Sequence, residues 1–136
     1  MATNGDNLPL SGSPLKQWSA IACSANGQIV IALCYGGGDP AYQSLDGGET
    51  WAAISALPSD LYIYPSPGKI AISGDGQYRA IIATKASDLQ SHLYQTVDGG
   101  ANWTDIISPV YQTTTSTDGT VQYGIDSSFI WKTTDN

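Results

Sequence analysis

The sequence predicts an all-β fold built from three antiparallel repeats, and three observations support this. A Ser-x-x-Gly motif occurs three times, at Ser24, Ser73 and Ser116, each time before an apolar-rich run. A longer block with an Asp-Gly-Gly core follows the first two motifs. No segment shows the 3.6-residue periodicity of an amphipathic helix, which leaves strands and turns as the elements.

The three Ser-x-x-Gly motifs are predicted hairpin turns. They read SANGQIVIAL, SGDGQYRAII and STDGTVQYGI. Their Asn-Gly and Asp-Gly pairs accept φ > 0 at both central positions, as a type I′ turn requires. On that two-residue register Cys23 pairs with Val30 and Cys34 with Ser19, which is too far apart for a disulfide. We expect both cysteines to be small buried apolar residues.

Apolar runs on either side of these turns give the predicted strands. They lie near 19–24, 28–35, 41–45, 50–55, 69–73, 77–85, 91–97, 102–107, 110–116, 120–126 and 128–133. The runs IVIALC and AIIAT are continuous, which is typical of strands buried on both faces. We divide the chain into a polar N-terminal arm, 1–15, and one all-β domain, 16–136, with repeats at about 16–55, 56–107 and 108–136.

A second block follows each hairpin at a variable distance. It reads AYQSLDGGETWAAI, then LYQTVDGGANWTDI, and its third copy is the shortened IWKTTDN. The octets 44–51 and 96–103 resemble the Asp-box, or BNR repeat, of sialidase-type β-propellers, whose pattern is Ser/Thr-x-Asp-x-Gly-x-Thr-Trp. The first copy matches fully and the second departs only at Asn102. The resemblance implies propeller blades, with the Asp-boxes on the blade periphery and away from any active site.

The physical interpretation of the box is structural. A short Asp side chain accepts hydrogen bonds from backbone N–H groups a few residues on, and two glycines allow φ > 0. The Trp covers the turn with a large apolar surface. We therefore expect these residues to lock turns rather than catalyse: Asp46, Gly47, Gly48, Trp51, Asp98, Gly99, Gly100, Trp103 and Asp135.

The closure of such a fold is a separate question. The segment from Trp18 matches those after Trp51 and Trp103, so we expect it to supply the closing strand that the third block lacks. Propellers usually have four to eight blades, so three do not close a ring. The alternatives are a six-bladed ring of two chains, a piece of a larger propeller, or a single-chain β-trefoil. The Asp-boxes favour propeller blades, and exposed sheet edges favour completion by oligomerisation.

Composition restricts the function. The chain has 136 residues and a net charge of −7, which argues against nucleic-acid and polybasic membrane binding. Family sialidases bind their substrate carboxylate through three arginines, whereas this chain has a single arginine, Arg79, and a single glutamate, Glu49. We place the lone histidine, His92, in a surface loop. The sequence thus predicts no enzyme, no catalytic residue, no metal site and no cofactor.

Two functions remain open. The first is a non-enzymatic structural or assembly protein, such as a virion component that decorates a phage capsid or belongs to a tail, with itself or other subunits as partners. The second is a glycan-binding module, in which Tyr62, Tyr64, Tyr78 and Trp131 supply stacking faces. The N-terminal segment lacks the pattern of a secretory signal peptide. Because a virion released by lysis reaches the outside without one, we expect a virion or extracellular surface, otherwise the cytoplasm.

Overall fold

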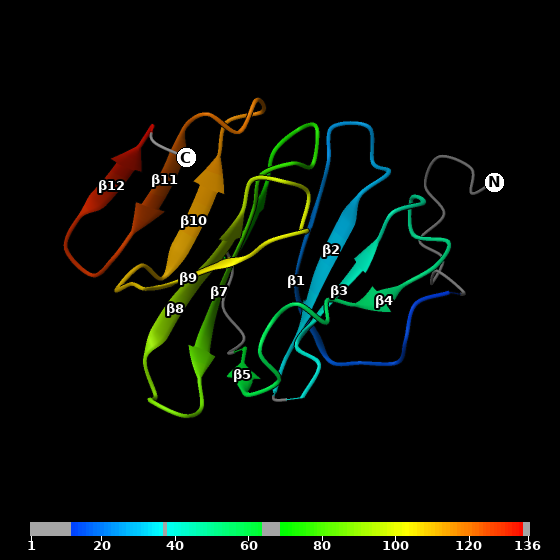
Figure 1. The fold of residues 1–136 in the computed structure, drawn as a ribbon, viewed down its shortest axis with the longest axis horizontal. Helices are drawn as coiled ribbons and strands as arrows, with labels where there is room; N and C mark the ends of the chain where they lie inside the picture. The colour runs from blue at the N-terminus through cyan, green and yellow to red at the C-terminus, as the bar shows by residue number, and fades with distance from the viewer. Residues whose placement is uncertain (1–11, 37, 64–68, 135–136) are drawn as a thin grey trace.

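The computed structural model describes residues 12–36, 38–63 and 69–134. These residues form twelve strands in three antiparallel sheets and no helix, which confirms the all-β prediction. The sheets stand side by side along the longest axis of the molecule (Figure 1). Each is open, as in a partial β-propeller and unlike a β-trefoil, and we call them blades 1, 2 and 3. No helix able to span a membrane occurs in the described ranges.

Each blade is a meander of neighbouring strands. Blade 1 has the order β1 (Trp18–Cys23), β2 (Val30–Cys34), β3 (Ala41–Ser44) and β4 (Ala52–Ala53). Blade 2 contains β5 (Leu61–Tyr62), β6 (Ile70–Ile72), β7 (Arg79–Lys85), β8 (Ser91–Thr96) and β9 (Thr104–Ile107). Blade 3 contains β10 (Gln112–Thr115), β11 (Gln122–Ile125) and β12 (Ile130–Thr133).

Strand β5 was not expected, because it lies in a segment that reads as a Pro-rich linker. Both β5 and β6 pair with β7 along the same edge, through Leu61 with Lys85 and Ile70 with Ile81. The first strand of blade 2 is therefore made in two pieces.

The first strands of the three blades lie next to one another, with β6 packed against both β1 and β10. Backbone hydrogen bonds join the turns that follow these strands. The Ala25 N–H donates to the Gly74 carbonyl over 2.8 Å, and the Gly74 N–H donates to the Thr117 carbonyl over 2.6 Å. These bonds set the three Ser-x-x-Gly turns in one row, which we call the turn row.

The type I′ prediction for these turns is wrong. Only the glycines have positive φ, at 70° for Gly27, 75° for Gly76 and 72° for Gly119, whereas the preceding Asn or Asp does not. The reason is a side-chain network: the Ser24 hydroxyl donates to Asn26 Oδ1 over 2.8 Å and accepts from the Ile29 N–H over 3.0 Å. This closes a longer loop in which only the glycine needs the left-handed region.

The cysteine predictions hold only in part. Cys23 pairs with Val30 as expected, but Cys34 pairs with Trp18, because a register shift between Trp18 and Ala20 leaves Ser19 as an extra residue. Both thiols are free, as expected. Cys34 is buried. Cys23 is exposed because it lies on the side of β1 that faces away from blade 2.

The prediction that the Trp18 segment closes the third blade is also wrong. It forms β1, the first strand of blade 1, and pairs with β2. Since this segment leads directly into the Ser24 turn, it forms a local hairpin, and its match to the segments after the other two Trp residues does not decide its pairing. Trp18 packs instead against Tyr42 and Trp51, with ring centroids 5.7 and 6.2 Å apart.

The main core lies between blades 1 and 2. Ile31 and Leu33 of β2 pack in one cluster with Ile63, Ile81 and Tyr94 of blade 2, all at most 2% exposed. A second, smaller cluster contains Ala71, Tyr78 and Ala80, with Leu93 packed against it. The contact between blades 2 and 3 therefore has much less apolar packing than the contact between blades 1 and 2.

Candidate functional site

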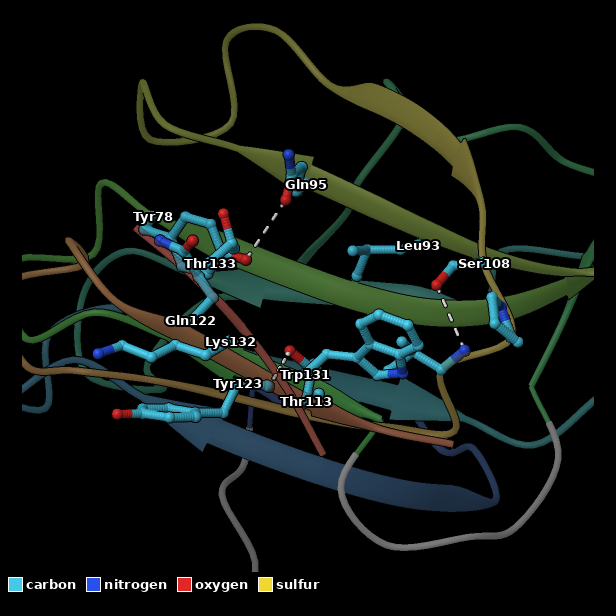
Figure 2. A pocket seen from close by; sticks show the side chains of 13 residues that line it. Tyr78, Leu93, Gln95, Ser108, Thr113, Gln122, Tyr123, Trp131, Lys132 and Thr133 are labelled. Carbon is cyan, nitrogen blue, oxygen red and sulfur yellow. Dashed lines mark hydrogen bonds between the residues drawn. The ribbon is translucent and has the colours of Figure 1, made fainter. Parts of the chain in front are cut away.

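A groove of about 370 Å³ lies between blades 2 and 3. Tyr78, Leu93 and Gln95 line it from blade 2, and Gly124 and Trp131 line it from blade 3. In Figure 2 the Trp131 ring lies near Ser108 and Leu93, and the Tyr78 and Gln95 side chains lie farther along the groove. The lining is mainly apolar, with amide and hydroxyl groups at intervals.

The groove follows from residue changes between repeats. Counted from the Ser that begins each turn, Thr113 and Gly124 of blade 3 occupy the positions of Ile70 and Ile81 in blade 2. Trp131 pairs with Gly124 as Tyr94 pairs with Ile81. A threonine and a glycine thus replace two isoleucines on the side of blade 3 that faces blade 2. Their side chains are too small to fill the contact between blades 2 and 3.

Trp131, like Tyr123, is a half-exposed aromatic residue at this groove. Its Nε1 donates to Asp126 Oδ2 over 2.8 Å, and its ring packs edge-on against Phe129 at 5.8 Å between centroids. These contacts fix the ring and leave part of its surface open toward the groove. Such a fixed, partly open indole is a suitable surface for stacking a flat or cyclic ligand.

The other predicted aromatics do not form one site with Trp131. Tyr78 lines the groove but is only 3% exposed, and burial raises its pKa to about 12, so its hydroxyl stays neutral. Tyr62 packs edge-on against Tyr35 at 5.9 Å and does not line the groove. Tyr64 lies outside the described residues. The structure thus brings two of the four together, and one of them is buried.

The first Asp-box has a dense hydrogen-bond network. Asp46 Oδ1 accepts from the Thr50 N–H over 2.9 Å and from the Ser44 hydroxyl over 2.7 Å, and Oδ2 accepts from the Thr50 hydroxyl. These bonds, led by that of the Thr50 side chain, lower the Asp46 pKa to about 2. Gly47 and Gly48 both have positive φ, at 74° and 97°.

The second Asp-box has the same arrangement around Asp98. Its carboxylate accepts from the backbone and side chain of Asn102, over 2.9 and 2.7 Å, and from the Thr96 hydroxyl over 2.7 Å. These bonds, first that of the Asn102 N–H, hold the Asp98 pKa well below its usual value. Gly99 and Gly100 have φ of 70° and 95°. Asp135 of the third copy lies outside the described residues.

The two box tryptophans differ in their surroundings. Trp51 Nε1 donates to the Gly48 carbonyl over 3.0 Å, and its ring contacts Trp18 on the outward face of blade 1. The Trp103 ring packs against the core between blades 1 and 2, and its buried Nε1 has no hydrogen-bond partner among the described residues. That these box residues act only as turn locks stays a prediction.

The position of His92 is a correction to the sequence analysis. It is not in a surface loop but in β8, where it is 3% exposed. Its Nδ1 lies 2.5 Å from Asp105 Oδ1 and its Nε2 lies 2.9 Å from Asp88 Oδ2. Burial alone lowers the His92 pKa, but the bonds to Asp105 and Asp88 outweigh it and raise the pKa. The alternation of β8, with His92 two residues before the buried Tyr94, was the signal that could have placed it inside.

This ion cluster joins three elements and leaves little free chemistry. Asp105 also pairs with Lys85 Nζ at 3.5 Å and accepts from the Tyr94 hydroxyl at 3.3 Å. Both ring nitrogens of His92 are therefore engaged with carboxylates. No group of three or more side chains suited to a metal ion is found in the described part of the chain.

Arg79 likewise has a structural position. It is 3% exposed, its Nε donates to the Gly76 carbonyl over 2.8 Å, and its NH1 group donates to Gln43 Oε1 over 2.7 Å. The side chain thus bridges blade 2 to blade 1.

Two further apolar surfaces lie on the sheet faces that no blade of this chain covers. The blade-1 face consists of Trp18, Ile21, Ala32, Tyr42 and Trp51, and includes a hollow of about 420 Å³. The blade-3 face consists of the apolar residues Tyr123, Ile125 and Ile130, which share one side of β11 and β12 with Lys132. Side chains alternate along a strand, so Ile125 and Ile130 lie on the side opposite to Gly124 and Trp131, whereas Tyr123 also borders the groove.

Comparison with known proteins shows the fold and not a family. No protein-family model and no curated protein sequence matches the chain. The structure of YCF48 bound to D1 peptide has a TM-score of 0.62 at 15% identity over 88% of this chain and 38% of YCF48. The GH74 enzyme of Niastella koreensis has a TM-score of 0.59 at 27% identity over 86% of this chain and 16% of the enzyme. Both are β-propeller proteins, and this chain spans less than two thirds of either one.

Proposed function

We propose that the chain is a non-enzymatic structural protein that assembles with other subunits through the blade-1 face and the blade-3 face. One observation carries the proposal. Ile21 of the blade-1 face and Ile125 of the blade-3 face are exposed, whereas the residues at the same two positions are buried where two blades of this chain meet. Exposed apolar surfaces of this kind mark sites of protein–protein contact.

The blade-1 face illustrates the contrast. Ile21 is 68% exposed, whereas Ile70, at the same position of blade 2, is 9% exposed because blade 1 covers it. Trp51 of this face corresponds to Trp103, which packs against the core. The blade-1 face therefore has the same kinds of apolar residue as the side of blade 2 that blade 1 covers.

The blade-3 face shows the same contrast. Ile125 is 38% exposed, whereas Leu33 and Ile82, at the same position of blades 1 and 2, are 0% and 1% exposed. Beside it, β12 pairs with β11 on one side and with no described strand on the other. An uncovered face next to a strand edge that no described strand pairs with favours association.

The positions of the charged groups support a function without catalysis. Glu49 is exposed within a turn, Arg79 bridges two blades, and His92 is enclosed by two carboxylates. Retaining or inverting glycosidases need two facing carboxylates with separate roles, whereas the Asp88 and Asp105 carboxylates are both bonded to the buried His92 ring between them. Turnover of aryl glycosides that one point substitution abolishes would contradict this part of the proposal.

The low content of charged residues, 12%, supports the expectation of a virion or extracellular surface as the setting. The assembly itself is tested by sedimentation velocity from about 1 to 100 μM, the range in which transient interfaces associate. We expect the wild-type chain to associate and Ile21→Lys and Ile125→Lys to weaken that association. Val97→Lys is the matched control, because Val97 is an exposed apolar residue of the second Asp-box, outside both faces. A wild-type chain that stays monomeric throughout would overturn the proposal.

A second candidate is glycan binding in the groove between blades 2 and 3. The specific observation is the half-exposed Trp131 ring in the same groove as the Gln95 amide, since carbohydrate sites combine an aromatic face with amide hydrogen bonds. A glycan array with wild-type protein and Trp131→Ala tests it. Binding that survives in Trp131→Ala, or is absent from the wild type, would contradict it.

A further inference from the structure

We infer that the blade-3 face of one copy docks on the blade-1 face of a second copy, and that two such contacts close two chains into one ring of six blades. The inference rests on the proposed function and names the partner of the same two faces. Propeller rings usually contain four to eight blades. The described residues form three blades in each copy, and six is the only multiple of three within that range.

The contact between blades 1 and 2 is the template. From blade 1 it contains Ile31, Leu33 and Ala41, and from blade 2 it contains Ile81 and Tyr94. The side chains on both sides of this contact are almost completely buried. Any two blades that present the same positions to one another can be expected to pack in the same way.

The blade-3 face presents the first half of this template. Counted from the Ser of each turn, Tyr123 and Ile125 occupy the positions of Ile31 and Leu33. Ile130 pairs with Ile125 as Ala41 pairs with Leu33.

The blade-1 face presents the second half. Ile21 and Ala32 occupy the positions of Ile70 and Ile81, and Tyr42 pairs with Ala32 as Tyr94 pairs with Ile81. The two open faces are therefore different from one another and correspond to the two sides of one internal contact. This predicts a head-to-tail contact and not the pairing of like faces.

The sizes of the side chains are complementary. Relative to the template, the blade-3 face is larger, with Tyr123 in place of Ile31 and Ile130 in place of Ala41. The blade-1 face is smaller, with Ala32 in place of Ile81, and it has the hollow of about 420 Å³. Two blade-3 faces would set bulky groups against each other and leave that hollow unfilled, so like-face pairing packs less well.

The turn row gives an independent argument. Within the chain each link runs from an N–H of one turn to a carbonyl of the next, from Ala25 to Gly74 and from Gly74 to Thr117. The row ends in an exposed turn on each side, at Ala25 and at Thr117. A second copy docked head-to-tail brings the Thr117 N–H to the Ala25 carbonyl of the other chain, which repeats the link and makes the row continuous around the ring.

A mixing experiment tests the pairing of unlike faces. Ile21→Lys alters only the blade-1 face and Ile125→Lys only the blade-3 face, so each variant alone has a damaged side in both of its contacts. We expect each to associate at least about tenfold more weakly than the wild type, because a charge would be buried without a partner. In a dimer of one Ile21→Lys chain and one Ile125→Lys chain, both substitutions fall in the same contact. The other contact then joins two unaltered faces. An equimolar mixture with distinguishable masses should therefore form mixed dimers in native mass spectrometry at concentrations where neither variant pairs alone.

Thr117→Pro is the second probe, because it removes the N–H that would link the copies without charging either face. Proline suits the second position of such a turn, and the Thr117 carbonyl remains for Gly74, so the fold should be retained. We expect an unchanged circular dichroism spectrum and weaker dimerisation. Thr120→Ala, in the same turn, is the control and should dimerise like the wild type.

The outcomes separate this inference from the proposed function. Mixed dimers together with a wild-type mass of two chains support it. Absence of mixed dimers, when both single variants associate more weakly than the wild type, overturns the head-to-tail pairing while assembly through the open faces stands. A variant at one face that associates like the wild type overturns the role of that face in both proposals. Wild-type species larger than two chains overturn ring closure. A monomeric wild type overturns both, and full dimerisation of Thr117→Pro overturns the continuous turn row.

Discussion

Asn102 holds Asp98 with two hydrogen bonds, from its backbone N–H over 2.9 Å and from its side-chain amide over 2.7 Å. In the first box Thr50 makes the same two bonds to Asp46 with its backbone and its hydroxyl. The departure of the second box from the Asp-box pattern therefore keeps both donors, because an amide N–H replaces the hydroxyl.

The first prediction is that the box aspartates stabilise the turns. Asp46→Ala and Asp98→Ala should each lower the melting temperature, because the N–H groups of Thr50 and Asn102 lose their acceptor. Glu49→Ala, in the first box, is the control and should leave it unchanged. Differential scanning calorimetry checks this. Loss of association or ligand binding in Asp98→Ala at an unchanged melting temperature would contradict the structural role.

The second prediction concerns acid. The Asp46 pKa is lowered to about 2, below the value of about 3.9 in an unfolded chain. Its stabilising contribution is therefore complete above about pH 4 and is lost as the pH falls through about 2. Urea midpoints measured between pH 5 and 2 should fall less steeply in Asp46→Asn than in the wild type. Equal slopes in the two proteins would refute the prediction.

The third prediction concerns neutral and mildly basic pH. The His92 pKa is raised by Asp105 and Asp88, with Lys85 and Tyr94 as the other titratable neighbours. Because the His92 pKa is higher in the folded protein, protonated His92 stabilises the fold fully below its unfolded-state pKa of about 6.5. This stabilisation is lost as the pH rises through the folded-state pKa. The melting temperature should thus decrease above about pH 6.5 in the wild type and change less in His92→Gln. An identical pH profile for both would show that the cluster does not titrate in this way.

The fourth prediction concerns the groove. A Cβ at Gly124 would lie 2.8 Å from Val110 Cγ1, so Gly124→Ala must displace that side chain. We expect a loss of about 1–3 kcal/mol in the free energy of unfolding, as for other overpacked sites. Val110→Ala removes the obstructing methyl groups, so Gly124→Ala should cost clearly less in that background. Additive effects in the double-mutant cycle would exclude the steric explanation.

Several features of the fold follow from local sequence alone. The positions of the hairpins and most of the strands were predictable, because a Ser-x-x-Gly turn and an Asp-box each satisfy their own backbone groups within a few residues. The Ser44 and Asp46 side chains, for example, bond only to the turn in which they lie.

Predictions that depended on distant residues failed. The exposed position of Cys23 and the burial of His92 each depend on which sheet face other parts of the chain cover. A short strand such as β5 forms because β7 offers an edge, although its own segment reads as a linker.

The sequence by itself determined that the chain forms three repeated antiparallel hairpin units, because turn chemistry and strand pairing act between residues close in the chain. Only the tertiary structure decided which contact is packed and which is open. Ile81 fills the contact between blades 1 and 2, whereas Gly124, at the same position of the next repeat, leaves a groove. The reason is that a contact between two blades is filled by side chains from two different repeats. Whether their combined volume fills the space cannot be read from one repeat alone.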